Sequence, residues 1–168
     1  MRFVKLGLIS IVFFCLLLTA FSLLLPSVTN ISRAIDINAP ADTVYAYINN
    51  IEKWKNWYAN YDSSEASLSS TTVGKGASLT LNKTTVTLQE VLPHKIKAEW
   101  QTGKNNPVEG EFNFIVKDSA SFVTLQWNFV QKVKWYPWQK IASILSDKTL
   151  GPFMEKCLEN LKKEAEKK

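Results

Sequence analysis

The chain divides into three stretches by the pattern of its hydrophobic and polar residues. Residues 6–25 carry no charge and few polar groups. Between about residues 31 and 129, apolar and polar positions alternate in short segments, the period of β-strands with one buried face. From Trp138 onward, apolar residues recur at helical spacing, with Lys and Glu opposite them. The pattern predicts an apolar helix, a β-sheet and a closing amphipathic helix.

The uncharged run over residues 6–25 is long enough to span a membrane. At about 1.5 Å of rise per helical residue it reaches roughly 30 Å, the thickness of the hydrocarbon core. Arg2 and Lys5 precede the run, and the positive-inside rule then keeps the N-terminus in the cytoplasm. We therefore predict an anchor over residues 1–26 and one domain over residues 27–168, on the outer side of the membrane.

A cleaved signal peptide is the alternative to an anchor. The apolar core of a signal peptide has about 7–15 residues and ends in a small-x-small cleavage site. The run here is longer, and Leu18 occupies the first small position of the candidate site around Ala20. Cys15 does not fit a lipoprotein signal, because the bulky Phe13 and Phe14 precede it. The sequence favours the anchor.

The middle of the chain predicts a strand, a short helical region and then a series of antiparallel strands. A first strand over residues 31–38 leads into a helix capped by Asp42 or a neighbour, and a second helical turn carries Trp54 and Trp57. Turn residues separate the strands that follow, at positions 74–76, 82–83, 93–94 and 103–107.

The closing helix has one apolar stripe. Pro152 fits a first turn or a kink, since a proline deeper in a helix costs about 3 kcal/mol. Beyond it, the apolar residues at helical spacing are Phe153, Met154, Cys157, Leu158, Leu161 and Ala165. We expect this stripe to face the sheet.

Composition excludes several classes of function. The net charge is +5, and Lys and Glu are interleaved at the C-terminus, so no basic patch for nucleic acid forms. Cys15 lies in the apolar run and Cys157 has no second cysteine in the domain, which leaves no disulfide. His94, the single histidine, follows Pro93 in a turn, where we expect it on the surface. We predict neither a metal site nor a cofactor.

Four motifs occur in order along the domain. Residues 35–40 read IDINAP and lead into VYAYI at 44–48, residues 54–57 read WKNW, residues 74–77 read GKGA, and a segment from GPF at 151–153 ends in LENLK at 158–162. With these motifs, residues 30–166 resemble the START-like (SRPBCC) superfamily, in its polyketide cyclase/dehydrase-like branch. Residues 58–60 depart from many relatives, which carry a Ser-Pro-Trp-like continuation there.

The resemblance implies an α+β helix-grip fold. In that fold a curved antiparallel sheet wraps around a long C-terminal helix, two short helices follow the first strand, and a hydrophobic cavity lies between sheet and helix. By strand parity and helix face, we predict that this cavity is lined by Leu88, Ala98, Trp100, Phe112, Phe114, Leu125, Trp127, Phe153 and Cys157. Aromatic stripes also form solid cores, so a filled interior is the alternative for each of these residues.

The sequence contains no constellation of residues that demands catalysis. Glu90 is the one carboxylate with inward strand parity; it either acts as a base in a dry pocket or points outward at a strand end. Together with Gln126, it is also a candidate polar group at the cavity rim. Gly74 and Gly76 lack the third glycine of a dinucleotide-binding loop, so they predict a turn.

The leading functional prediction is a membrane-anchored carrier or sensor of a hydrophobic small molecule or lipid. A polyketide cyclase/dehydrase-type or hydrolase-type enzyme using the same cavity is the alternative, and an interaction module with a filled cavity is the third. Four bulky residues at 135–138, WYPW, either close one end of the cavity or lie at the lipid interface. The sequence predicts no oligomeric state.

Overall fold

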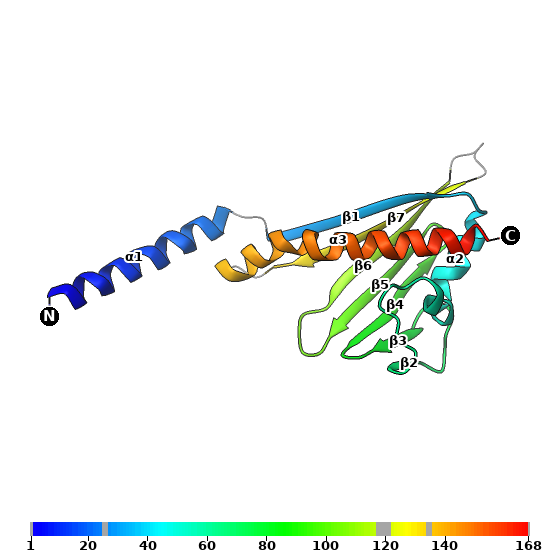
Figure 1. Ribbon diagram of the computed structural model, residues 1–168, viewed down its shortest axis with the longest axis horizontal. Coiled ribbons are helices and arrows are strands. Elements are labelled where there is room, and N and C mark those ends of the chain that lie inside the picture. Colours follow the sequence, from blue (N-terminus) through cyan, green and yellow to red (C-terminus); the bar gives the residue numbers. More distant parts are fainter. Residues whose placement is uncertain (1, 25–26, 117–121, 134–135, 168) are drawn as a thin grey trace.

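The elements follow one another as a helix, a strand, two short helices, six further strands and a long helix (Figure 1). The computed structural model describes residues 2–24, 27–116, 122–133 and 136–167, with side chains throughout except at residues 2 and 141–145. In these ranges the elements are α1 Arg2–Leu24, β1 Val28–Ile37, α2 Ala41–Asn49, the 3-10 helix η1 Ile51–Asn56, β2 Ala66–Leu68, β3 Ser78–Leu81, β4 Thr84–Leu92, β5 Lys95–Thr102, β6 Val108–Val116, β7 Val123–Lys132 and α3 Pro137–Ala165.

The described strands form one antiparallel sheet in the order β1-β7-β6-β5-β4-β3-β2. Successive strands are neighbours except at one edge, where β1 pairs with β7 and aligns Ile31 with Phe129. The curved sheet holds α3 against its inner face (Figure 1). The predicted helix-grip fold is therefore confirmed.

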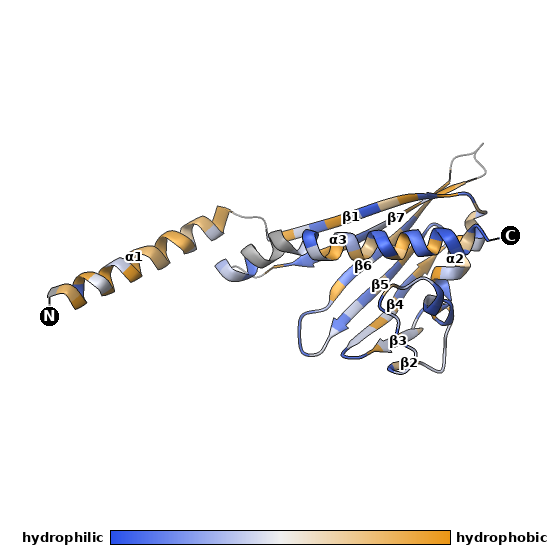
Figure 2. Ribbon diagram, viewed as in Figure 1, coloured by the Kyte–Doolittle hydropathy of each residue, from blue (hydrophilic) through white to orange (hydrophobic). Residues whose placement is uncertain are grey.

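The inner face of the sheet and the inner stripe of α3 form the core. Strand alternation buries Leu79, Ile96 and Leu125 completely, because their side chains all point toward the helix. From α3, Met154 and Leu161 meet them with no exposed surface. The predicted stripe of α3 is confirmed, and it is visible as alternating apolar and polar turns (Figure 2).

The helix α3 runs without interruption through Gly151 and Pro152. The end of the flexible Arg33 side chain of β1 lies against this glycine: a Cβ at position 151 would lie 2.3 Å from a guanidinium nitrogen of Arg33. The same guanidinium donates to Glu155 Oε1 at 2.6 Å and to Asp147 Oδ1 at 3.0 Å. Ion pairs of Arg33 therefore link β1 to α3 beside Gly151, and Pro152 lies inside the helix rather than in its first turn.

The polar positions predicted at the cavity rim lie elsewhere. A β-bulge between Leu88 and Glu90 shifts the register, so that Val91 turns inward and Glu90 outward. Glu90 is half-exposed and pairs with Lys97 Nζ at 2.6 Å. Gln126 lies on the outer face, where its amide donates to Ser32 Oγ at 3.1 Å. Neither Glu90 nor Gln126 lines a cavity between sheet and helix.

Two further details differ from the sequence prediction. The strand β2 was not expected, because its residues lack a run of alternating apolar positions. The N-cap of α2 is Pro40, without a side-chain cap, and Asp42 lies inside the first turn. A carboxylate there still interacts favourably with the helix dipole.

The helix α1 is apolar on all sides and projects away from the domain (Figure 2). Its length and composition suit a membrane anchor, and a signal sequence at an N-terminus shares them. The end of the predicted anchor, residues 25–26, lies outside the described residues. Contacts between α1 and α3 place its C-terminal end beside the beginning of α3.

Candidate functional site

An aromatic cluster fills the space between the sheet and α3. Its ring pairs include Phe112 stacked on Trp127 with centroids 4.9 Å apart and Trp100 edge-on to Phe129 at 4.6 Å. Contacts of this kind stabilise a core beyond the area they bury. The members of the cluster are Trp54, Trp57, Tyr58, Trp100, Phe112, Trp127, Phe129 and Phe153.

The W-x-x-W motif is fixed in this cluster by its indole N–H groups. Trp54 Nε1 donates to the carbonyl of Ile48 at 2.9 Å, and Trp57 Nε1 donates to that of Tyr47 at 3.3 Å. Both tryptophans are thereby held beneath α2, and the chain leaves η1 directly into Tyr58. The motif therefore positions Tyr58 at the outer limit of the cluster.

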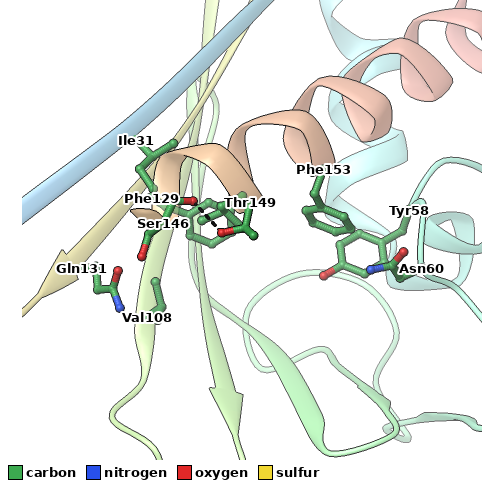
Figure 3. Close-up of a pocket in the computed structure, with 10 residues that line it drawn as sticks. Ile31, Tyr58, Asn60, Val108, Phe129, Gln131, Ser146, Thr149 and Phe153 are labelled. Carbon is green, nitrogen blue, oxygen red and sulfur yellow. Dashed lines mark hydrogen bonds between the residues drawn. The ribbon is translucent and has the colours of Figure 1, made fainter. Parts of the chain in front are cut away.

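An open pocket lies beside the cluster, between the N-terminal half of α3 and the sheet (Figure 3). Its volume is about 460 Å³, within the usual range for a small-molecule site. Half of the described lining is apolar and half is polar. The lining residues are Ile31, Tyr58, Asn60, Val108, Phe129, Gln131, Ser146, Thr149, Leu150 and Phe153.

Tyr58 separates this pocket from the cluster. Its ring packs edge-on against Phe153 with centroids 5.3 Å apart, and its hydroxyl accepts a hydrogen bond from Trp100 Nε1 at 3.2 Å. Burial raises the pKa of Tyr58 to about 12, so its hydroxyl keeps its proton at physiological pH. A hydroxyl that accepts from Trp100 can still donate its own proton toward the pocket.

Polar groups lie along the opposite side of the pocket. Thr149 and Ser146 come from α3, where Thr149 Oγ1 donates to the carbonyl of Ser146 at 3.2 Å (Figure 3). Gln131 comes from the end of β7 on the same side, whereas Asn60, from the loop after η1, lies beside Tyr58 (Figure 3). The pocket therefore suits a ligand with both an apolar part and hydrogen-bonding groups.

A second pocket continues the first toward the α1 end of the domain. It has a volume of about 340 Å³ and shares Val108 and Gln131 with the first. Its further lining includes Lys132, Val133 and Gln139, which lie near the end of β7 and the beginning of α3. Together the two pockets form a groove along the N-terminal half of α3.

The structure distributes the nine predicted lining residues between the groove and the core. Phe153 lines the first pocket and Trp100 the second. The others are buried in the core, with at most 5% of their surface exposed: Leu88, Ala98, Phe112, Phe114, Leu125, Trp127 and Cys157. The role of all nine in ligand contact stays a prediction.

The groove residues that the sequence analysis missed share a cause. Ile31, Val108 and Gln131 lie near strand ends, where alternation alone does not show whether the core or a surface groove lies opposite. Thr149 and Leu150 precede Gly151 and were left out of the inner stripe. The one available signal was the departure at residues 58–60, which contribute Tyr58 and Asn60.

Two buried groups in this region have chemistry that bears on the site. Burial raises the pKa of the Cys157 thiol to about 12, and its sulfur accepts from the backbone N–H of Ala59 at 3.3 Å. The thiol is therefore a structural contact and not a nucleophile. Trp127 Nε1 is buried without a hydrogen-bond partner among the described residues, which leaves a costly unpaired donor in the core.

Few described residues near the pocket could act as a general acid or base or bind a metal ion. The described residues lining the first pocket include no histidine and no carboxylate. Among all described residues, no group of three or more His, Cys, Asp or Glu side chains is placed to hold a metal ion. Glu90 forms a hydrogen bond with Lys97 that lowers the pKa of its carboxyl, the opposite of what a catalytic base requires.

Comparisons with known proteins agree with the fold. A family model described as polyketide cyclase / dehydrase and lipid transport matches residues 28–166. Among curated proteins, none matches the chain.

Several solved structures share the fold at low sequence identity. A protein of Nitrosospira multiformis is 14% identical with a TM-score of 0.62, over 82% of this chain and 96% of that one. Norcoclaurine synthase of Thalictrum flavum is 10% identical with a TM-score of 0.64, over 84% and 95%. The di-domain ARO/CYC protein BexL of the BE-7585A biosynthetic pathway is 13% identical with a TM-score of 0.63, over 84% of this chain and 51% of BexL.

Proposed function

The chain belongs to the polyketide cyclase, dehydrase and lipid transport family, and from that membership we propose that it binds a hydrophobic small molecule or lipid. The binding site is the groove along the N-terminal half of α3. In this proposal the protein is a carrier or sensor held at a membrane by α1, and it performs no chemistry on its ligand.

The composition of the first pocket carries the proposal. Ile31, Phe129, Leu150 and Phe153 provide an apolar surface of the kind that holds acyl chains or rings. On the same pocket, the Tyr58 hydroxyl and the other polar groups offer hydrogen bonds.

The membrane part of the proposal rests on α1. Its side chains are almost all exposed and apolar, and α3 contacts it only near its C-terminal end, where Ser22 is buried. Lipid is the environment in which such a helix is stable, since it satisfies its own backbone hydrogen bonds. We propose that residues 1–26 anchor the chain, that the N-terminus is cytoplasmic, and that residues 27–168 form the domain on the outer side.

An enzyme is the second candidate, because family members and fold relatives include catalysts such as norcoclaurine synthase. The described pocket argues against it. Tyr58 is its one ionisable group there, and the pKa of about 12 makes it a weak acid and a poor base near neutral pH. Binding without turnover agrees better with this lining.

Photo-crosslinking tests the binding site. The full-length chain, reconstituted in phosphatidylcholine vesicles, is irradiated with a phospholipid that carries a diazirine in its acyl chain. We expect adducts in peptides that contain Tyr58 and Phe153, in addition to those in α1. Adducts confined to α1 would refute a lipid site in the groove.

A matched pair of variants makes the test specific. Val108 faces both pockets, so Val108→Trp should fill the groove and remove the Tyr58 and Phe153 adducts. Val73→Trp places the same ring at an exposed position outside both pockets and should leave the adducts unchanged. Turnover of the probe lipid during incubation would instead favour the enzyme.

Carbonate extraction tests the anchor separately. Full-length protein should stay in the membrane pellet at alkaline pH, because a spanning helix is not released by charge repulsion. A shorter, soluble form in the supernatant would show that α1 is a cleaved signal peptide.

A further inference from the structure

Ser27, the first described residue after α1, is tied by hydrogen bonds to the end of β7 and to the beginning of α3. The backbone N–H of Val133 donates to the carbonyl of Ser27 at 2.8 Å. Lys140 Nζ donates to Ser27 Oγ at 2.9 Å. The first described residue after α1 is therefore fixed to the end of β7 and to the first turn of α3 (Figure 1).

An exposed aromatic pair lies at the same place. Trp138 is 67% exposed, the most exposed large apolar side chain outside α1 in the described part of the chain. Its ring stacks on Tyr136 with centroids 5.1 Å apart and planes within 8°. The four other described tryptophans are all at most 7% exposed, so the exposure of Trp138 is an exception that the fold does not require.

The exposure of Trp138 favours one of the two interpretations of the WYPW segment, the one at the lipid interface. A side chain that closed the cavity would be covered by the sheet or by α3, whereas 67% of the surface of Trp138 is exposed. Trp135 lies outside the described residues. Val28, the next most exposed apolar residue of the domain at 53%, also lies at this end, directly after Ser27.

We propose that Tyr136, Trp138 and Val28 form a second membrane contact, here called the aromatic foot, which rests in the headgroup region of the bilayer. The inference depends on the proposed insertion of α1. The apolar run of α1 ends within a few residues of Ser27, so Ser27 and the side chains tied to it lie at the level where hydrocarbon meets headgroups. Tryptophan and tyrosine are enriched at that level, because one part of the ring is apolar and another is polar.

A membrane contact at this site has a consequence for the groove. The second pocket is lined by Val133, three residues before Tyr136 in the sequence, and by Gln139, which follows Trp138 on α3. The foot would hold this end of the groove against the bilayer surface. A lipid would then enter the groove from the membrane without crossing water, and the source of the ligand would be the bilayer that holds the anchor.

Fluorescence quenching of Trp138 in vesicles tests the proposal. The full-length chain is reconstituted in phosphatidylcholine vesicles, with or without bromine near the carbonyl end of the acyl chains. The Trp138 signal is the difference between the wild type and Trp138→Phe, a variant of an exposed ring that should fold normally. We expect brominated lipid to quench this difference signal strongly and acrylamide in the water to quench it weakly.

A control tryptophan at the other end of the sheet shows how strongly each quencher acts on a ring that is exposed to water. Leu92, the last residue of β4, is 44% exposed and remote from the foot by the strand register. The signal added by Leu92→Trp should be quenched by acrylamide and not by brominated lipid.

Each other outcome overturns the proposal in a recognisable way. Chains that do not float with the vesicles would refute the anchor, and the foot with it. Chains that float, but whose Trp138 is quenched by acrylamide alone, would refute the foot and leave the anchor intact. Protection of Trp138 from both quenchers would show that a protein partner or a second copy covers the surface.

Discussion

Adding one methyl group beneath Trp100 should weaken the aromatic cluster. Gly110 of β6 lies under the Trp100 ring, and a Cβ at this position would be 2.3 Å from Trp100 Cζ3 and 3.0 Å from Phe129 Cε1. Ordinary carbon contacts begin near 3.5 Å. Because a Cβ cannot remain 2.3 Å from a ring carbon, Gly110→Ala forces the indole of Trp100 to move, and the Phe129 ring must also shift slightly.

The free-energy cost has three parts. Overpacking a close-packed interior by one methyl group costs about 1–3 kcal/mol. Moving the indole also weakens the Trp100 Nε1 hydrogen bond to Tyr58, a loss of about 1 kcal/mol. Replacing a glycine by alanine in a strand lowers the conformational entropy of the unfolded chain, which stabilises the folded state by about 0.5–1 kcal/mol. We therefore expect Gly110→Ala to lower the free energy of unfolding by about 2 kcal/mol.

A double-mutant cycle isolates the cause. Unfolding of the full-length chain by guanidinium in mild detergent is followed by near-ultraviolet circular dichroism, which reports on the packed rings. In a Trp100→Leu background the methyl group at position 110 meets a smaller and more flexible side chain. There Gly110→Ala should be close to neutral, which gives a coupling energy of about 2 kcal/mol.

Additivity would refute the reasoning. If Gly110→Ala cost the same with and without the Trp100 ring, the penalty would arise from the strand backbone and not from the indole. The near-ultraviolet signal supplies a second criterion, since the Gly110→Ala spectrum should already differ from that of the wild type before any denaturant is added.

Two further predictions concern the helix face and alkaline pH. Leu158→Asp should destabilise the domain by several kcal/mol, because an unpaired charge enters the helix–sheet interface. The control variant Lys163→Asp, at an exposed position, should change stability by only tenths of a kcal/mol. Equal melting temperatures of the two variants would show that the inner face of α3 is misassigned. Burial raises the pKa of Tyr58 from 10 to about 12 and that of Cys157 from 9 to about 12. Each protonated group therefore contributes stability to the folded state. That contribution is complete below the pKa of the group in the unfolded chain and is lost as the pH rises toward 12. Unfolding curves between pH 8 and pH 12 should therefore show falling stability, with a shallower slope in Tyr58→Phe; an unchanged slope would mean that Tyr58 ionises as freely in the folded state as in the unfolded one.

Most of the fold could be predicted from the sequence because the fold depends on local patterns of apolar and polar residues. Alternation along β5, β6 and β7 identified which side chains point inward, and the apolar stripe identified the inner face of α3. The error at Glu90 has a specific physical cause. One extra residue in the bulge reverses the parity that follows it, and no residue type in that segment marks a bulge.

The candidate site was harder to predict, since a groove depends on where elements end and not on their period. The length of α3 before Gly151 decides which side chains overhang the ends of β6 and β7. Arg33 contributes to that placement through contacts with Asp147 and Glu155, more than a hundred residues away in sequence. Such distant pairings cannot be deduced from hydrophobic periodicity.

The pairing of β1 with β7 has a consequence for folding during synthesis on the ribosome. Ile31 leaves the ribosome almost a hundred residues before its partner Phe129, and at about 5–20 residues per second the first strand waits of the order of ten seconds for its neighbour. Until then β1 is an unpaired edge beside the most apolar segment of the chain, the arrangement most prone to wrong pairing. Polar residues at its outward positions, Asn30, Ser32 and Asp36, keep that waiting strand soluble. A chaperone that protects nascent chains would therefore find its principal target in the first forty residues.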